Sequence, residues 1–228
     1  MKQNAYTVLL LDLDGTLVDS APGLTEALAQ LLSEQNLPAP SLSEVIPMVG
    51  DGARKLVEKA LIWAEADPPP DLDTATARFL HLYANTLIAD TKLYESVNET
   101  LLSLSDQGWR MAVCTNKPEA PSRTILENLG LAHLFEQIAG GDSYPARKPD
   151  PRHLTDCLKA MGASPREAVM IGDGHNDLLA GQSAGLATIW ADYGYGGDRA
   201  AALPRDGVIS AFSELPESLR QLQARCSA

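Results

Sequence analysis

Short, nearly continuous apolar segments alternate with helical patterns along most of this 228-residue chain. Such a segment has the length and composition of a strand that is buried on both faces of a parallel sheet. The strand candidates are Thr7–Asp12, Met111–Thr115, Phe135–Ala139, Ala168–Gly172 and Ala187–Ala191, of which Phe135–Ala139 is the weakest. Alternating strands and helices with short connections predict an α/β fold, with a doubly wound parallel sheet and helices on both of its faces.

One region interrupts this alternation. From Pro22 to about Ala89 the pattern contains helices and no convincing strand. Three apolar stripes at helical spacing are separated there by two proline-rich breaks, Leu37–Pro40 and Asp67–Pro70. The simplest architecture is an all-helical domain that is inserted after the first strand and acts as a cap. We therefore expect a core domain made of residues 1–17 and 93–228, and a helical cap domain made of residues 18–92.

Composition limits the possible partners. The formal net charge is -12, from 30 acidic and 18 basic side chains, and such a surface repels nucleic-acid phosphates and anionic membranes. No apolar segment reaches the ~20 residues that a membrane span needs, and the N-terminus lacks the pattern of a signal peptide. Three widely spaced cysteines suggest neither a disulfide framework nor a zinc site. We expect a cytoplasmic protein, and the sequence does not choose between a monomer and a homodimer.

Polar side chains gather where the expected strands end, which is the edge where open parallel sheets form their active sites. Carboxylates crowded at one edge are unfavourable unless a cation lies among them. Oxygen ligands without a cysteine or histidine cluster suit Mg2+ better than zinc, and Mg2+ shares its coordination shell with substrate phosphates. The sequence therefore predicts a Mg2+ cofactor and a phosphorylated ligand at this edge. The residues concerned are Asp12, Asp14, Thr115, Asn116, Lys148, Asp173 and Asp177.

Asp12 and Asp14 lie two residues apart on an extended segment, so their side chains point to the same side. One carboxylate can then attack phosphorus while the other manages the proton. Taken singly, these residues have structural explanations. Asp14 before Gly15 suits a plain turn, Lys148 suits the surface, and the remaining polar residues suit helix starts. Their combination at one sheet edge favours a catalytic interpretation.

Four segments of the chain resemble, in order, the four motifs of the haloacid dehalogenase superfamily. The resemblance covers most of the chain and implies a Rossmann-like core, while the helical insert after the first strand resembles the type 1 cap of that superfamily. Dehalogenases of the superfamily lack the second aspartate of the first motif, so its presence here implies phosphoryl chemistry. The segments are Asp12-x-Asp14-Gly15-Thr16, Thr115-Asn116, Lys148, and Gly172-Asp173 with Asp177.

The resemblance also implies a role for each acidic residue. Asp12 would attack phosphorus and form an aspartyl-phosphate. Asp14 would protonate the leaving oxygen and later deprotonate the hydrolytic water. Mg2+ would be bound by Asp12, the backbone carbonyl of Asp14 and Asp173. Asp177 would orient the waters of the metal.

For the remaining motif residues the resemblance implies phosphate binding. Thr115 and the amide of Asn116 would hold phosphate oxygens. Lys148 would offset the negative charge on Asp12 and on the transferring group.

Two further segments resemble bacterial phosphoglycolate phosphatases. Val49–Val57 is similar to their cap segment, and Tyr193–Gly196 to their stretch of Gly and Tyr after the last core strand. The resemblance implies hydrolysis of 2-phosphoglycolate to glycolate and phosphate. Gly50 would allow the backbone to approach the substrate closely. Arg54 or Lys55 would meet the substrate carboxylate, with a solvated helix face as the alternative for both.

Other functions remain open at this point. Leu93–Val97 stands where Tyr-Pro-Gly-Val is usual in these phosphatases, which weakens the substrate assignment. Related phosphatases act on sugar phosphates, nucleotides or pyrophosphate. A β-phosphoglucomutase would use the same chemistry but protect its aspartyl-phosphate from water, and the segment around Gly50 does not resemble the mutase cap motif. A non-catalytic regulatory protein would be expected to lose a catalytic carboxylate, whereas Asp12, Asp14 and Asp173 are all present.

Overall fold

The computed structural model describes residues 6–227, and the side chains of residues 6–225. Its centre is a sheet of parallel strands in the order β5-β4-β1-β6-β7-β8. The first strand along the chain, β1, lies in the middle and pairs with β4 on one side and β6 on the other. This is the predicted doubly wound α/β sheet. The strands are β1 (Val8–Leu11), β4 (Arg110–Cys114), β5 (Gln137–Ala139), β6 (Ala168–Gly172), β7 (Ala187–Ala191) and β8 (Gly207–Ile209).

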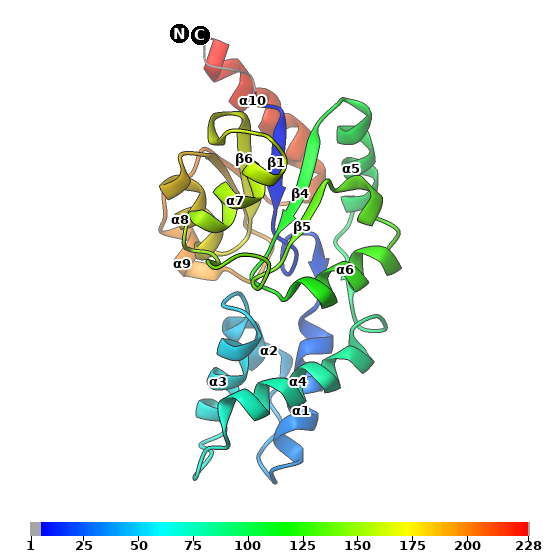
Figure 1. Cartoon of the computed structure of the whole chain (residues 1–228), viewed down its shortest axis with the longest axis vertical. Helices are drawn as coiled ribbons and strands as arrows, with labels where there is room; N and C mark the ends of the chain where they lie inside the picture. Colours follow the sequence, from blue (N-terminus) through cyan, green and yellow to red (C-terminus); the bar gives the residue numbers. More distant parts are fainter. Residues whose placement is uncertain (1–5, 228) are drawn as a thin grey trace.

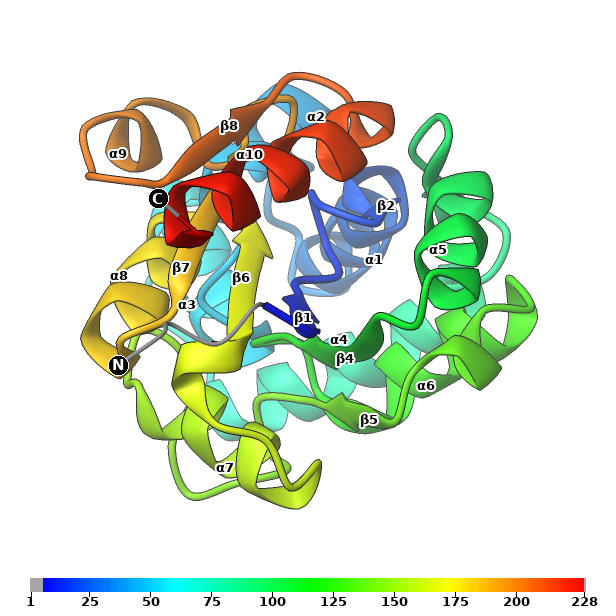
Figure 2. The same ribbon diagram turned by 90° about the horizontal axis from the view of Figure 1, so that it is seen from above.

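Helices cover both faces of this sheet (Figure 2). Because side chains alternate along a strand, Leu9 and Leu11 of β1 enter one apolar core while Val8 and Leu10 enter the other. The first core is closed by α5 (Val97–Asp106), α6 (Glu119–Asn128) and α10 (Leu215–Ser227), and the second by α7 (Arg152–Ala160) and α8 (His175–Ala184). A short helix, α9 (Gly197–Ala201), follows β7. Within residues 6–227, no helix has the length and apolar character that crossing a bilayer requires.

Residues 20–91 form a separate helical layer below the carboxyl ends of the strands (Figure 1). This cap contains α1 (Ala21–Ser33), α2 (Leu42–Val45), α3 (Ala53–Trp63) and α4 (Leu72–Thr86), and this stretch, which the structure describes completely, has no strand. The apolar stripes that the sequence shows are buried between the helices, for example Leu28, Val57 and Phe79. The apolar cluster of the cap is continuous with the first core of the sheet, and the cap covers the sheet edge where the polar motifs lie.

The cap joins the core through a small antiparallel ribbon, made of β2 (Val18–Asp19) and β3 (Lys92–Leu93). Val18 pairs with Leu93, and Asp19 with Lys92. The division of the chain that the sequence suggests, at 17/18 and 92/93, falls on this ribbon. Neither the ribbon nor the edge strand β8 was expected from the sequence, because segments of two or three residues carry no periodic signal.

Candidate active site

A tight turn at the end of β1 carries the first two carboxylates. The Asp12 amide still bonds to the Ile171 carbonyl of β6 at 2.9 Å, so Asp12 is held in the register of the sheet. Gly15 then takes a φ of +82°, and a side chain there would overlap the carboxylate of Asp173. The turn therefore requires a glycine for two reasons, its backbone conformation and its closeness to Asp173. It places Asp12 and Asp14 together at the carboxyl edge of the sheet.

Three carboxylates converge beside this turn. Asp12, Asp173 and Asp177 each present an oxygen within 4.8 Å of the other two. Burial and the charges of Asp12 and Asp177 raise the pKa of Asp173 well above its ordinary value. Burial and Asp12 likewise raise the pKa of Asp177 to about 7, although Lys148 opposes the shift. Crowded, dehydrated carboxylates of this kind favour a bound cation, and a set of oxygen donors fits Mg2+.

Lys148 lies at the centre of the motif residues and is almost completely buried, with 1% of its side chain exposed. Its Nζ donates to the Cys114 carbonyl at 2.6 Å and to Asp177 at 2.5 Å, and it lies 3.0 Å from Asp12 Oδ1. Burial alone would lower the pKa of Lys148, but Asp12 and Asp177 outweigh it and hold the pKa above the usual lysine value. Lys148 is therefore a permanent positive charge against Asp12, and Asp177 fixes its position.

The Gly- and Tyr-rich stretch after β7 holds Asp173. The Tyr195 amide donates to Asp173 Oδ2 at 2.7 Å, and the hydroxyl of Thr16 donates to Asp173 Oδ1 at 3.0 Å. At Gly194 any side chain would overlap the Asp173 side chain. The resemblance of Tyr193–Gly196 to a phosphatase motif thus has a physical counterpart, because the stretch packs directly on a proposed metal ligand.

Thr115 and Asn116 follow β4 and face the turn of β1. Both side chains are buried. The Asn116 side-chain amide donates to the Gly50 carbonyl of the cap at 3.0 Å and to the Lys148 carbonyl at 2.8 Å. Asn176 donates to the same Gly50 carbonyl at 3.2 Å. Gly50 is therefore the point where the cap loop is held against the core, and it is close to the motif residues.

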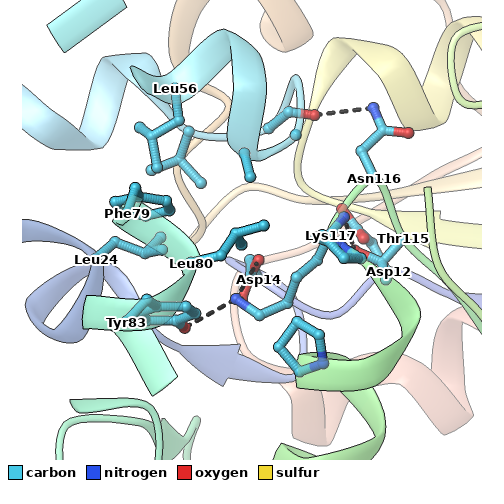
Figure 3. Close-up of a pocket in the computed structure, with 16 residues that line it drawn as sticks. Asp12, Asp14, Leu24, Leu56, Phe79, Leu80, Tyr83, Thr115, Asn116 and Lys117 are labelled. Carbon is cyan, nitrogen blue, oxygen red and sulfur yellow. Dashed lines mark hydrogen bonds and ion pairs between the residues drawn. The ribbon is translucent and has the colours of Figure 1, made fainter. Parts of the chain in front are cut away.

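Asp14 has partners that the sequence interpretation did not include. The Ser20 hydroxyl donates to Asp14 Oδ1 at 2.6 Å, and Lys117 Nζ lies 3.1 Å from each Asp14 oxygen. Lys117 also donates to the Tyr83 hydroxyl of cap helix α4 at 2.8 Å (Figure 3). Lys117 follows Asn116 directly in the chain, and Ser20 lies six residues after Asp14, so closeness in the sequence was the available signal. No such signal existed for Tyr83, because the apolar stripe of α4 that contains it is explained by core packing alone.

Arg54 lies elsewhere. Its guanidinium pairs with Asp73 at 2.9 Å, and 51% of its side chain is exposed. Ala53 and Leu56, the neighbours of Arg54 on α3, do line the cavity next to Asp12, whereas Arg54 is not among the lining residues. The structure thus brings the Gly50 loop to the site but leaves Arg54 on the outer face of the cap.

Two cavities meet at Asp12 and Asp14. The smaller one, with a volume of about 40 Å³, lies between core and cap, and its walls include Leu24, Leu56 and Phe79 (Figure 3). The larger one, of about 360 Å³, contains Lys148 and the acidic trio Asp12, Asp173 and Asp177. Asp12 and Asp14 line both. The site is therefore divided into a mainly apolar compartment and a strongly charged one, with the two carboxylates of the first motif between them.

Comparison with known proteins shows the family of the chain. The chain is 39% identical over 216 residues to the phosphoglycolate phosphatase of Rhodospirillum rubrum, with 92% of this chain and 90% of that protein covered. It is 39% identical over 217 residues to the phosphoglycolate phosphatase of Yersinia pseudotuberculosis, with 94% of each covered. A crystal structure described as a predicted phosphoglycolate phosphatase from Haemophilus somnus superposes with a TM-score of 0.87 at 33% identity, covering 93% of this chain and 97% of that one. The family profile of haloacid dehalogenase-like hydrolases matches residues 6–185, and the chain therefore belongs to that family, as its motifs predicted.

Proposed function

We propose that this protein is a Mg2+-dependent phosphomonoester hydrolase that converts 2-phosphoglycolate to glycolate and inorganic phosphate through an aspartyl-phosphate. One observation supports this most directly. Asp12, the proposed nucleophile, lies between a charged compartment that suits a metal and a phosphate and a small compartment that suits a leaving group. Asp14 borders the small compartment, where a departing oxygen would need its proton.

The residues of the chain account for each chemical step. An oxygen of Asp12 attacks phosphorus, the bond from phosphorus to the ester oxygen breaks, and Asp14 donates a proton to that oxygen. Asp14 then takes a proton from a water, whose oxygen attacks the phosphorus of the aspartyl-phosphate and releases phosphate and free Asp12. The Leu13 amide, 2.8 Å from Asp12 Oδ1, and Lys148, 3.0 Å from it, orient the nucleophile.

Asp12, Asp173 and the backbone carbonyl of Asp14 would hold Mg2+, and Asp177 would orient its waters through the contacts described above. When bound, Mg2+ supplies positive charge that offsets the carboxylates and the phosphate oxygens. Lys148 adds a second positive charge on the same side of Asp12, and Thr115 and Asn116 would hold the phosphate from β4. An anionic substrate can then approach a chain whose net charge is -12.

The size of the small compartment supports a small leaving group. A volume of about 40 Å³ has room for about three waters, which is close to the size of a two-carbon carboxylate fragment. The names of the relatives point to the same substrate, since the two compared above are phosphoglycolate phosphatases.

The test is a measurement of phosphate release with Mg2+ from a panel of 2-phosphoglycolate, hexose phosphates, nucleotides and pyrophosphate, with Asp12→Asn as the blank. We expect kcat/KM for 2-phosphoglycolate to exceed that for every other ester. A higher kcat/KM for a sugar phosphate or a nucleotide would disprove the substrate and keep the mechanism. Turnover by Asp12→Asn equal to that of the wild type would disprove the mechanism as well.

A further inference from the structure

The small compartment between cap and core contains an unexpected cation. Among the residues in the described part of the chain that line it, Lys117 is the only lysine or arginine. Its side chain is 4% exposed, and the surrounding walls include Leu24, Leu56 and Phe79. Taking an ammonium group out of water costs several kcal/mol before any partner is counted. A lysine at this place therefore needs an explanation.

Lys117 is protonated where it lies. Its Nζ lies 3.1 Å from both carboxylate oxygens of Asp14 and 2.8 Å from the Tyr83 hydroxyl, and these acceptors stabilise the ammonium form. The ammonium group also lies 4.5 Å from the centre of the Tyr83 ring, a distance that favours a cation. The compartment thus presents a fixed positive charge to any group that enters it.

The partners of Lys117 leave part of its binding capacity open. An ammonium has three N–H donors. Asp14 Oδ1 and Oδ2 both lie 3.1 Å from Nζ, so one shared N–H is able to serve both oxygens, and a second N–H serves the Tyr83 hydroxyl at 2.8 Å. The Tyr83 hydroxyl accepts this bond and still has its own proton to donate. If one N–H of Lys117 serves both Asp14 oxygens, another is left for a ligand, while the Tyr83 hydroxyl proton has the Thr91 side chain as one partner and a ligand in the compartment as another.

We propose that Lys117 and Tyr83 together bind the carboxylate at the far end of the substrate from the phosphate, and so determine specificity for small phosphorylated acids. The inference rests on the proposed function, because it assigns the second anionic end of 2-phosphoglycolate. In Figure 3 the Lys117 side chain extends between Asp14 and Tyr83, below Leu56 and Phe79. The apolar walls lower the local dielectric, which strengthens an ionic contact and disfavours a neutral, hydrated group.

This assignment differs from that of Arg54 or Lys55, the cations that the sequence suggested for the same task, of which Lys55 pairs with Glu58 at 2.6 Å. Arg54 has Asp73 as a partner and is half exposed. Lys117 faces Asp14, and Asp14 borders the reacting ester oxygen in the proposed mechanism. A carboxylate two bonds away from that oxygen would fall within reach of Lys117. The proposal also makes recognition depend on cap closure, since Tyr83 comes from α4.

The alternative role for Lys117 is to hold Asp14 in place, without contact to the substrate. Two esters of the same length separate the roles. They are 2-phosphoglycolate and 2-hydroxyethyl phosphate, which replaces the carboxylate with a neutral hydroxymethyl group. A residue that only positions Asp14 affects both esters by the same factor. A residue that binds the carboxylate affects the charged ester more.

The experiment compares kcat and KM of both esters for wild type, Lys117→Met, Tyr83→Phe and a matched control, Lys159→Met, which removes an exposed lysine of α7. For Lys117→Met we expect the preference for the charged ester to fall about 10- to 100-fold, mainly through KM, as for one hydrogen bond to a charged group. For Tyr83→Phe we expect a fall of about 3- to 10-fold, and for Lys159→Met no change. Thermal unfolding checks that each variant is folded.

Three outcomes overturn the inference. The first is a wild type without preference for the charged ester, and the second is an equal loss on both esters in Lys117→Met. The third outcome is an unchanged preference for the charged ester in Tyr83→Phe. It decides the question if Lys117→Met does not fold. Failure of the proposed function is recognised separately, because it appears in the wild type as absent phosphate release from 2-phosphoglycolate.

Discussion

The two compartments of the site are built by different means. The charged compartment takes its reacting groups from the core, namely the carboxylates at the ends of β1 and β6 and Lys148, while part of its wall comes from the cap residues Pro47, Val49, Gly50, Asp51 and Lys59. The small compartment is made half by the core and half by the cap, through Lys117 and Tyr83. The reacting groups thus all belong to the core domain, while selection of the leaving group depends on a contact between core and cap side chains.

This difference predicts which substitutions should lower turnover and which should change the choice of substrate. Substitutions in the charged compartment should reduce turnover of every ester by a similar factor. Substitutions at the cap–core boundary should change the choice between esters or the apparent affinity. The predictions below test this division in order of decreasing expected effect.

Asp12→Asn should abolish turnover of all esters, lowering kcat by a factor on the order of 10⁴ or more, because loss of a nucleophile removes the covalent route. Its side chain keeps nearly the same size, so the fold should persist. Steady-state phosphate release measures the first effect, and circular dichroism with thermal unfolding serves as the control. A folded variant that kept a tenth of the activity would place the nucleophile elsewhere.

Removal of Mg2+ with a chelator should also stop turnover, and it should affect stability in a pH-dependent way. In the metal-free protein the pKa of Asp177 is raised to about 7, and that of Asp173 is raised as well. A carboxyl group with a raised folded pKa binds more protons folded than unfolded, so the metal-free fold loses stability as the pH rises through about 4 to 7. Mg2+ binds the charged carboxylates and offsets this loss.

At one fixed Mg2+ concentration, about 100 times its Kd at pH 8, we therefore expect the Tm to rise by roughly 5–10 °C at about pH 8, and by clearly less at about pH 5. Thermal unfolding with and without Mg2+ at the two pH values measures the difference, with Asp173→Asn as the variant that should lose most of it. Equal Tm shifts at both pH values would contradict the assignment of the acidic trio as the metal site.

Asn176→Ala should weaken cap closure without changing the chemistry. Its amide donates to the Gly50 carbonyl at 3.2 Å and to Asp51 at 2.8 Å, and Asn116 still holds Gly50 in the variant. We expect KM to rise about fivefold with little change in kcat, as for the net loss of about one hydrogen bond. Asn128→Ala, at an exposed position of α6, is the matched control. A selective fall in kcat would instead assign Asn176 to the chemical step.

Arg54→Ala should have the smallest effect, because the side chain is half exposed and pairs with Asp73. We expect kcat/KM for 2-phosphoglycolate to stay within about twofold of the wild type, since exposed ion pairs contribute about 0–1 kcal/mol. A loss of tenfold or more on 2-phosphoglycolate, but not on 2-hydroxyethyl phosphate, would restore the sequence-based assignment of the substrate carboxylate to Arg54.

The sequence predicted the parts that depend on local pattern. The apolar runs identified β1, β4, β6 and β7, and because parallel strands end at one edge, the motif residues could be expected to meet there. The ribbon of β2 and β3 could not be predicted, since it pairs Val18 with Leu93 across the whole cap. The contact between Lys117 and Tyr83 had the same limitation. It joins Lys117, which follows a core strand, to Tyr83, whose position in the sequence indicates only packing of a cap helix.

Tyr195 fixes one end of the cap to the core. Its amide holds Asp173, and its hydroxyl accepts from the Ser20 and Ala21 amides and donates to Asp19, where α1 begins. A cap rotating about this end behaves as a lever. Ser20, beside the pivot, would move little and keep its bond to Asp14, and Tyr83, whose ring packs at Gly23 near the start of α1, would also move little, while the Gly50 loop would travel farther. Asp14 would then keep its bonds to Ser20 and Lys117 and remain aligned through the opening and closing of the enzyme.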